Sequence, residues 1–349
     1  MNRLRKVFFK ATAICLGLIV GLAAVETAIR LLGVGPRLPR EYGNNVSLGS
    51  LLYKPKPLSR IAGRNNTDEF DYDYRHNSFG FRDVEHDIVK TKTTFRILGL
   101  GDSFTYGAGV GFEETYLYRL EKMLNSRTGE HPKVEIIKAG IPRYFPESER
   151  ILLEEYAPLF QPDLVMVGFL PNDVIDTYMG LDAVMVDEGG YLKNREAAGL
   201  GRLGAQVYRY SHVGRIVIDR YVAWKIAKKY QPRSDEIFQA EGFHETDWAL
   251  VEQEYGKMAA IANSVHARFV IFHIPQKGPW SEKHRYPGAR LSAWATTRSA
   301  TFADMLPAME RASALNRLYY EKDGHCTPAG HATIADELYR YLTDHQFIL

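Results

Sequence analysis

A small set of residues, scattered over most of the chain, has the side-chain types that acyl transfer needs. Ser103 directly follows an apolar run in "FRILGLGDSFTYGAG" (95–109). Gly, Asp and Ser are common turn formers, so the triplet alone indicates no more than a turn. A serine becomes a nucleophile only when a base removes its proton, and imidazole suits that task at neutral pH. The imidazole in turn needs a carboxylate that fixes its tautomer.

The segment "EKDGHCTPAGH" (321–331) contains both of these partners, with His325 as the candidate base and Asp323 as the candidate acid. Acyl transfer also needs hydrogen-bond donors for the oxyanion, each worth about 3–4 kcal/mol of barrier. We expect these donors to be the Ser103 and Gly140 backbone N–H groups and the Asn172 side-chain amide. Gly140 suits this role because its N–H can approach a substrate without hindrance from a side chain.

Each of these residues also has a simpler interpretation. Gly140 can merely end a strand, and Asn172-Asp173 can cap a helix. Asp102 is expected to hold the turn together rather than to react. His325 and His331 are conceivable metal ligands, but Gly330-His331 is better explained as the start of the last helix, so we predict no metal site. The stretch "LGLGDSF" lacks the third glycine of a dinucleotide fingerprint.

The elements around these residues alternate between strand and helix patterns. Buried strands are predicted at 94–100, 133–140, 162–170 and 267–275. Helices are predicted between Glu113 and Asn125 and at 147–159, 248–265 and 331–342. This alternation favours a mostly parallel sheet with helices on both faces. The carboxyl ends of parallel strands share one edge, so the candidate residues are expected to converge there.

Four segments together resemble the SGNH/GDSL esterase-lipase superfamily over about residues 93–345. "GDSFTYG" (101–107) resembles the nucleophile block with Ser103, and "AGIP" the second block, with Gly140 as oxyanion donor. "PND" resembles the third block through Asn172, and "DGHCTPAGH" the last, with His325 as base. The resemblance implies a flavodoxin-like three-layer α/β/α sandwich. It also implies hydrolysis or transfer of acyl groups on lipids, glycans or small esters, without a cofactor.

The sequence departs from this family at two positions. The third block usually has Gly one residue from Asn, whereas Gly168 lies four residues before Asn172. The last block usually has its acid three residues before His, where this chain has Lys322. Asp323 is therefore assigned as the acid, an Asp-x-His spacing that a related subset of periplasmic polysaccharide acetylation enzymes also uses.

The N-terminus has the pattern of a membrane anchor. Arg3, Arg5 and Lys6 precede an apolar run from Val7 to Val25 whose only charge is Lys10. This length approaches the ~20 residues of a membrane-spanning helix, and the leading positive charges predict a cytoplasmic N-terminus. The alternatives are a signal peptide cleaved near Gly21-Leu22-Ala23 and a core helix. The helical pattern continues through 28–32, which favours an uncleaved anchor.

The whole chain is predicted to consist of an anchor (1–35), a stem and N-terminal extension (36–92) and the SGNH-like domain (93–349). The anchor and the segment "HNSFGFRD" resemble a bacterial membrane-anchored subgroup of the family, but we assign no regular element to 68–86. An insertion at about 175–247 is expected to hold a hairpin around "DAVMVDEGGYL" and an amphipathic helix near "VGRIVIDRYVAWKIAKKY". That helix is expected to pack on the domain, with contact to a membrane surface as the alternative.

Composition limits the other function classes. The net charge of +2 over 349 residues gives no reason to expect nucleic acid or an acidic surface as partner. Cys15 and Cys326 lie in different environments, so they form neither a disulfide framework nor a CxxC metal pattern. Oligomeric state is not predicted.

Three hypotheses follow for the function. The first is a membrane-anchored serine esterase that cleaves an ester, an O-acyl group on a glycan or related envelope substrate, with its catalytic domain outside the cytoplasm. The second is an acyltransferase that passes the same acyl group to a polysaccharide hydroxyl. The third is a catalytically silent glycan-binding scaffold.

Overall fold

The computed structural model describes residues 3–35, 42–49, 52–129, 131–186, 190–194, 201–230, 245–298 and 300–348. A five-stranded parallel sheet lies at its centre. In spatial order its strands are β6 (Lys133–Gly140), β5 (Thr94–Gly101), β7 (Leu164–Phe169), β10 (Arg268–His273) and β11 (Thr301–Asp304). Numbered along the chain this order is 2-1-3-4-5, which is flavodoxin-like. It confirms the predicted fold class.

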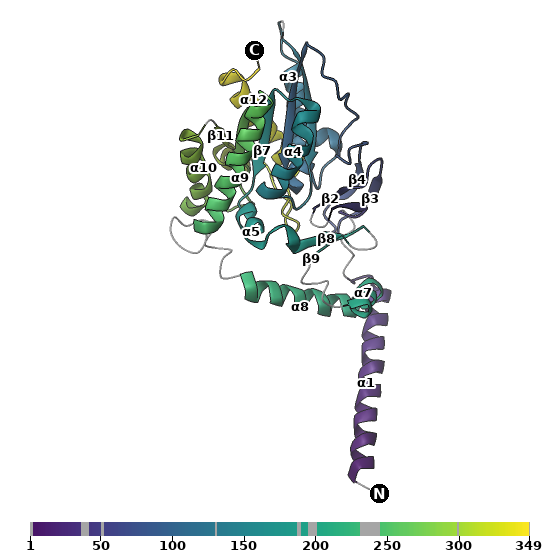
Figure 1. Ribbon diagram of the computed structural model, residues 1–349. Coiled ribbons are helices and arrows are strands. Elements are labelled where there is room, and N and C mark those ends of the chain that lie inside the picture. The colour runs from purple at the N-terminus through teal and green to yellow at the C-terminus, as the bar shows by residue number, and fades with distance from the viewer. Residues whose placement is uncertain are drawn as a thin grey trace. The chain divides into compact units, whose positions relative to one another are not determined.

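Helices cover both faces of this sheet and make it the middle layer of a sandwich (Figure 1). One face carries α4 (Pro146–Phe160), α9 (Glu245–Ser264) and α10 (Tyr286–Thr296). The other carries α3 (Tyr116–Asn125), α11 (Leu306–Ser313) and α12 (Pro328–Asp344). Shorter elements are α2 (Ser103–Tyr106), α5 (Asn172–Met179) and the 3₁₀ turns Phe112–Glu114, Leu181–Ala183 and Glu282–Arg285.

Side chains of the central strands alternate between two hydrophobic cores. On β5, Leu98 and Leu100 belong to the core under α4 and α9, whereas Ile97 belongs to the core under α3 and α12. This follows from the two-residue period of a strand, because successive Cβ atoms point to opposite faces. The apolar runs of the sequence are continuous for the same reason: each strand is buried on both faces.

The segment before β5 contains two small antiparallel sheets. β1 (Asn45–Leu48) pairs with β2 (Leu52–Pro55), and β3 (Arg60–Arg64) pairs with β4 (Asp71–Arg75). β4 alternates exposed and buried side chains, so that Tyr72 and Tyr74 pack with Phe70 and Tyr106 in a third core. The predicted stem and the unassigned stretch 68–86 are therefore folded against the sandwich. Parts of the stem, 36–41 and 50–51, lie outside the described residues.

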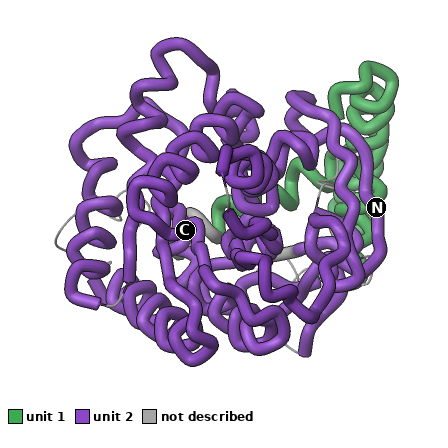
Figure 2. The backbone as a smooth tube through the Cα atoms, turned by 90° about the horizontal axis from the view of Figure 1, so that it is seen from above, with its two compact units in different colours: residues 1–39, 194–231 green, residues 40–193, 232–349 purple. Residues whose placement is uncertain are grey.

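The chain divides into two compact units, 1–39 with 194–231 and 40–193 with 232–349 (Figure 2). The first contains α1 (Arg3–Leu32), α7 (Gly201–Tyr210) and α8 (His212–Tyr230), and is called the anchor unit after the anchor predicted from the sequence. The second contains the sandwich and the strands β8 (Val184–Val186) and β9 (Leu192–Asn194), which form the expected two-stranded sheet; it is called the catalytic unit after the candidate catalytic residues it carries. The predicted amphipathic helix, α8, thus belongs to the same unit as α1. Residues 187–189, 195–200 and 231–244 of the insertion lie outside the described residues.

Candidate active site

Ser103, His325 and Asp323 form a hydrogen-bonded line at the carboxyl edge of the sheet. His325 Nε2 lies 2.8 Å from Ser103 Oγ, and His325 Nδ1 lies 2.5 Å from Asp323 Oδ1. The His325 ring also packs against Phe104, with 4.9 Å between ring centroids. The side chains of His325 and Asp323 are mostly buried. This geometry lets the imidazole accept a proton from the serine while the carboxylate holds the opposite ring nitrogen.

The turn that presents Ser103 is built from local hydrogen bonds. Asp102 caps the single-turn helix α2, because its Oδ1 accepts a bond from the Phe104 N–H at 2.8 Å. Gly107 ends the turn in the left-handed conformation at φ 82°, which glycine adopts without steric cost. Asp102 therefore holds the turn, as the sequence predicts, and Ser103 sits at the first position of α2.

Three glycines at the ends of neighbouring strands form a socket for Thr105, the middle of this turn. A Cβ on Gly101 of β5 would lie 2.0 Å from Thr105 Oγ1, and one on Gly168 of β7 would lie 3.0 Å from the same atom. A Cβ on Gly140 of β6 would lie 2.4 Å from the Tyr106 backbone nitrogen. Because these three strand positions lack side chains, α2 can pack directly against the strand ends. This packing sets the position of Ser103 relative to the sheet.

The socket explains why Gly168 lies four residues before Asn172. Gly168 is the fifth residue of β7 and makes space for Thr105, whereas Asn172 begins α5 after three further residues. Asn172 Nδ2 donates to Asp176 Oδ2 at 3.0 Å. The amide is therefore already engaged by a carboxyl group, with which an oxyanion would compete. The oxyanion roles of Ser103, Gly140 and Asn172 stay predictions.

Two residues of the N-terminal extension support the candidate site. Arg82 lies in the segment "HNSFGFRD", to which the sequence assigned no role, and Glu69 lies in none of the motifs. Arg82 is buried, and its guanidinium donates to the carbonyl oxygens of Tyr106 and Val110, at 3.1 and 2.7 Å, so it holds the loop that follows Ser103. Glu69 accepts backbone N–H bonds from Glu321, Lys322 and Asp323, at 2.8, 2.8 and 2.7 Å. These bonds fix the loop that carries the candidate acid.

Asp323 meets the imidazole from the loop that Glu69 holds. Burial raises the pKa of Asp323, but the hydrogen bond with His325 and the charge of that ring outweigh it, so the pKa lies below its usual value. Asp323 Oδ2 accepts a further, longer bond from Asn65 Nδ2 at 3.4 Å.

Replacing Glu69 by glutamine is expected to slow the acyl transfer predicted from the sequence by about 10- to 100-fold while the protein stays folded. The neutral amide cannot accept three N–H bonds as well as a carboxylate does, and the loop that positions Asp323 would shift. The turnover number on a small ester, with circular dichroism as the folding check, measures this effect. Glu321→Gln, in the same loop but highly exposed, is the control; equal rates for both variants would refute the positioning role.

Tyr42 is a further neighbour of the candidate base His325, and the sequence gives no reason to expect it. Its hydroxyl lies 3.5 Å from His325 Nε2, the nitrogen that also faces Ser103. The aromatic ring is tilted by 60° to the imidazole. A residue near the amino end of the catalytic unit therefore borders the position where substrate would react.

Buried carboxyl groups surround the base of the nucleophile turn. Burial raises the pKa of Asp102 to about 7, although its bond from Phe104 opposes the shift. Burial also raises the pKa of Glu149 and of Asp173 well above their usual values, and the charges of neighbouring carboxylates add to this. Neither oxygen of Glu149 has a hydrogen-bond partner. Glu149 is thus held in its neutral form, since an ionised carboxylate without a partner is costly to bury.

This cluster predicts that the catalytic unit becomes less stable as pH rises from 5 to 8. An unfolded chain loses the Glu149 proton near pH 4.5, whereas the folded chain retains it. The folded state then binds more protons, so each such carboxyl lowers the free energy of unfolding by up to about 1.4 kcal/mol per pH unit. Glu149→Gln is expected to reduce this slope, as measured by denaturant unfolding at both pH values. Glu147→Gln, in the same helix, should leave the slope unchanged; an unaltered slope in Glu149→Gln would contradict the assignment.

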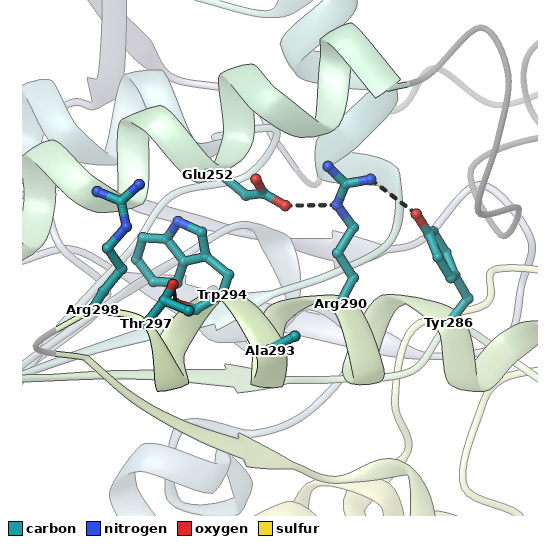
Figure 3. A pocket seen from close by; sticks show the side chains of 7 residues that line it. All are labelled: Glu252, Tyr286, Arg290, Ala293, Trp294, Thr297 and Arg298. Carbon is teal, nitrogen blue, oxygen red and sulfur yellow. Dashed lines mark hydrogen bonds and ion pairs between the residues drawn. The ribbon is translucent and has the colours of Figure 1, made fainter.

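A separate depression of about 420 Å³ lies on the surface between α9 and α10 (Figure 3). Arg290 occupies its middle and is bound by Glu252 Oε1 at 2.6 Å and by the Tyr286 hydroxyl at 2.9 Å. Glu245 adds two more bonds to the same guanidinium. The charge of Arg290 is thus already compensated, and neither Ser103 nor His325 lines this depression.

No protein-family model and no curated protein matches the chain. Several solved structures are similar to its fold. They include TesA, with 14% identity over 71% of this chain and 98% of that one at a TM-score of 0.43. A catalytic mutant of Axe2, an acetylxylan esterase from Geobacillus stearothermophilus, has 14% identity over 70% and 93% of the chains, also at 0.43. The esterase EstA from Pseudoalteromonas sp. has 12% identity over 72% and 98%, again at 0.43. Because these identities and TM-scores are low, the similarities do not show what the site does chemically, and that has to be inferred from the site's own geometry.

Proposed function

We propose that this chain is a membrane-anchored serine esterase that removes an O-acyl group from a glycan or related envelope molecule. The observation that carries the proposal is the continuous line from Ser103 Oγ through both ring nitrogens of His325 to Asp323 Oδ1. Each member has the residue type and the spacing that nucleophilic catalysis requires. The proposal adds no metal and no cofactor.

In the first half of the proposed reaction, His325 Nε2 takes the proton from Ser103 as Oγ attacks the acyl carbonyl carbon. Asp323 keeps the proton on Nδ1 and stabilises the imidazolium that forms. The Ser103 and Gly140 N–H groups and the Asn172 amide receive the oxyanion. The imidazolium then protonates the leaving sugar oxygen, and the acyl group stays on Ser103.

In the second half, water attacks the acyl-enzyme while Nε2 takes one of its protons. Collapse of the second tetrahedral intermediate returns the proton to Ser103 Oγ and releases the carboxylic acid. A sugar hydroxyl in place of water would make the chain a transferase, through the same acyl-enzyme.

The anchor is proposed from α1. Its segment Arg5–Leu32 is long and apolar enough to cross a membrane, with a mean hydropathy of 2.2 in the most apolar window, and none of that window is buried. The basic residues Arg3, Arg5 and Lys6 ahead of the apolar run favour a cytoplasmic N-terminus. We infer that the catalytic unit lies on the extracytoplasmic side.

The proposed esterase is tested by labelling the full chain with a fluorophosphonate. This probe reacts with a serine only when a base activates it. Labelling is expected in the wild type, absent in Ser103→Ala and retained in Ser126→Ala, an exposed serine that serves as the control. An unlabelled wild type would instead support the silent scaffold. Measuring acetate release against acetyl transfer to an oligosaccharide then separates esterase from transferase.

A further inference from the structure

The helices α7 and α8 of the anchor unit expose an unusual number of apolar side chains. On α7 these follow the one-face spacing i, i+4, i+7, and on α8 three of the four described do the same, with Ile216 lying off this face. The residues are Leu203, Val207 and Tyr210 on α7, and Val217, Tyr221 and Trp224 on α8. Trp224 is 57% exposed and Leu203 is 80% exposed. The surfaces of soluble proteins expose large apolar residues singly, whereas contiguous exposed stripes of them mark interaction sites.

The end of the apolar helix α1 holds these two helices. The Glu26 carboxylate accepts bonds from the His212 and Val213 N–H groups, at 3.0 and 2.9 Å, and from the Ser211 hydroxyl at 3.0 Å. It therefore caps the N-terminus of α8, where negative charge is favourable. Arg30, one turn further along α1, donates to the Tyr210 carbonyl at the end of α7.

The elbow between α7 and α8 is itself closely packed. A Cβ on Gly214 would lie 2.3 Å from Val207 Cγ1, so the two helices approach each other through this glycine. Arg215 is buried and donates to the Tyr208 and Arg209 carbonyls, which lie near the end of α7. The direction of α8 is thus fixed relative to α7 and, through Glu26, relative to α1.

The point of attachment sets the depth of the elbow in a bilayer. The apolar run Val7–Val25 measures about 28 Å along a helix, close to the hydrocarbon thickness of a bilayer. Glu26 is the next residue, so it falls where the hydrocarbon ends and the headgroups begin. Within the anchor unit α8 runs crosswise to α1 (Figure 1). With α1 upright, α8 therefore lies parallel to the membrane surface at headgroup level.

The charge of α8 suits an anionic surface. Its sequence contains five Lys or Arg residues, of which Arg215 is buried in the elbow, and one acidic residue, Asp219. Two lysines lie over the exposed aromatic rings: Lys225 Nζ is 5.6 Å from the Tyr221 centroid, and Lys228 Nζ is 5.4 Å from that of Trp224. Aromatic rings and neighbouring cations are the side chains that occupy the headgroup region, and the cations are attracted by anionic lipids.

We propose that α7 and α8 bind the surface of a bilayer that contains anionic phospholipid, with Tyr221 and Trp224 at the boundary between headgroups and acyl chains. This contact rests on the proposal that α1 crosses the membrane. The segment that carries α7 and α8 then forms a second membrane attachment. The chain is held at the surface by a helix that lies in the interface as well as by one that crosses the membrane.

The test uses the full chain in vesicles of phosphatidylcholine, with and without phosphatidylglycerol, in which the lipid tails are brominated near the headgroup. Subtracting the emission of Trp224→Phe from that of the wild type isolates Trp224. Its emission is expected to fall at least about twofold in brominated lipid, and further when phosphatidylglycerol is present. The matched difference for Trp280→Phe, a tryptophan of the catalytic unit, should show no such loss. Charge reversal at Lys225 and Lys228 should remove the dependence on phosphatidylglycerol.

Two results would overturn the proposal while the anchor remains intact. Trp224 emission quenched by aqueous iodide but not by brominated lipid would place this face in water. Protection from both quenchers would mean that protein covers it, either the catalytic unit or a second copy of the chain. A chain washed from the vesicles at alkaline pH would refute the membrane insertion of α1 and this contact together. Fluorophosphonate labelling of the same samples reports on the esterase separately.

Discussion

Replacing His325 by alanine is expected to lower the turnover number for ester hydrolysis by about 10⁴- to 10⁶-fold. The imidazole is the group placed to take the Ser103 proton, at 2.8 Å, and Nε2 faces no other carboxylate or imidazole among the described residues. Without it the hydroxyl is a poor nucleophile and the leaving oxygen has no proton donor. Burst-phase measurement with a chromogenic ester should show that the acylation step itself is lost.

Replacing the acid partner, Asp323, should lower the turnover number less than replacing His325 does. Asp323→Asn is expected to cost about 10³- to 10⁴-fold, because the amide cannot enforce the required tautomer or stabilise the imidazolium. His345→Ala, at an exposed position, is the matched control and should retain full activity. If His325→Ala kept more than about a tenth of wild-type activity, the line of Ser103, His325 and Asp323 would not be the catalytic machinery.

A methyl group added at Gly140 is expected to abolish activity and to destabilise the catalytic unit. The Cβ of alanine would lie 2.4 Å from the Tyr106 nitrogen and 2.5 Å from the Thr105 carbonyl carbon, both of them backbone atoms. Since backbone cannot turn aside as a side chain can, α2 must move, and Ser103 moves with it. Overpacking of this kind costs about 1–3 kcal/mol or more. The thermal midpoint and the labelling rate of Gly140→Ala measure the two effects.

Gly256→Ala provides the control for this variant. A Cβ at Gly256, inside helix α9, would meet nothing within 4 Å. Alanine is favoured over glycine in a helix interior, so this change should raise stability by up to about 1 kcal/mol. A Gly140→Ala protein that labels at the wild-type rate with an unchanged midpoint would show that the socket tolerates a side chain and does not fix Ser103.

The sandwich was predictable because apolar residues recur along its strands and helices with a clear periodicity. The predicted strand at 133–140 coincides with β6, and the other three expected strands correspond to β5, β7 and β10 within two residues at each end. The missed strand, β11, has only four residues and pairs along one edge, so its sequence carries too short a pattern. The two antiparallel pairs before β5 were missed because they are short and polar on one side.

The candidate triad was accessible to sequence reasoning because each member stands in a block with its own local signature. Ser103 and His325 were named from such blocks, and the structure brings their side chains together. The supporting residues were not accessible. Glu69 and Arg82 act through contacts with segments far along the chain, and nothing in a carboxylate or a guanidinium near the start of the sequence indicates its target.

Those two residues have a practical consequence for anyone who trims the polypeptide. A shortened gene product that begins at Thr93, where the recognisable motifs start, would still encode the central sheet and the Ser, His and Asp of the candidate triad. It would lack the guanidinium that secures the loop after the nucleophile and the carboxylate that secures the loop of the acid. A version intended for assays should therefore start upstream of β1 and remove no more than the apolar helix α1.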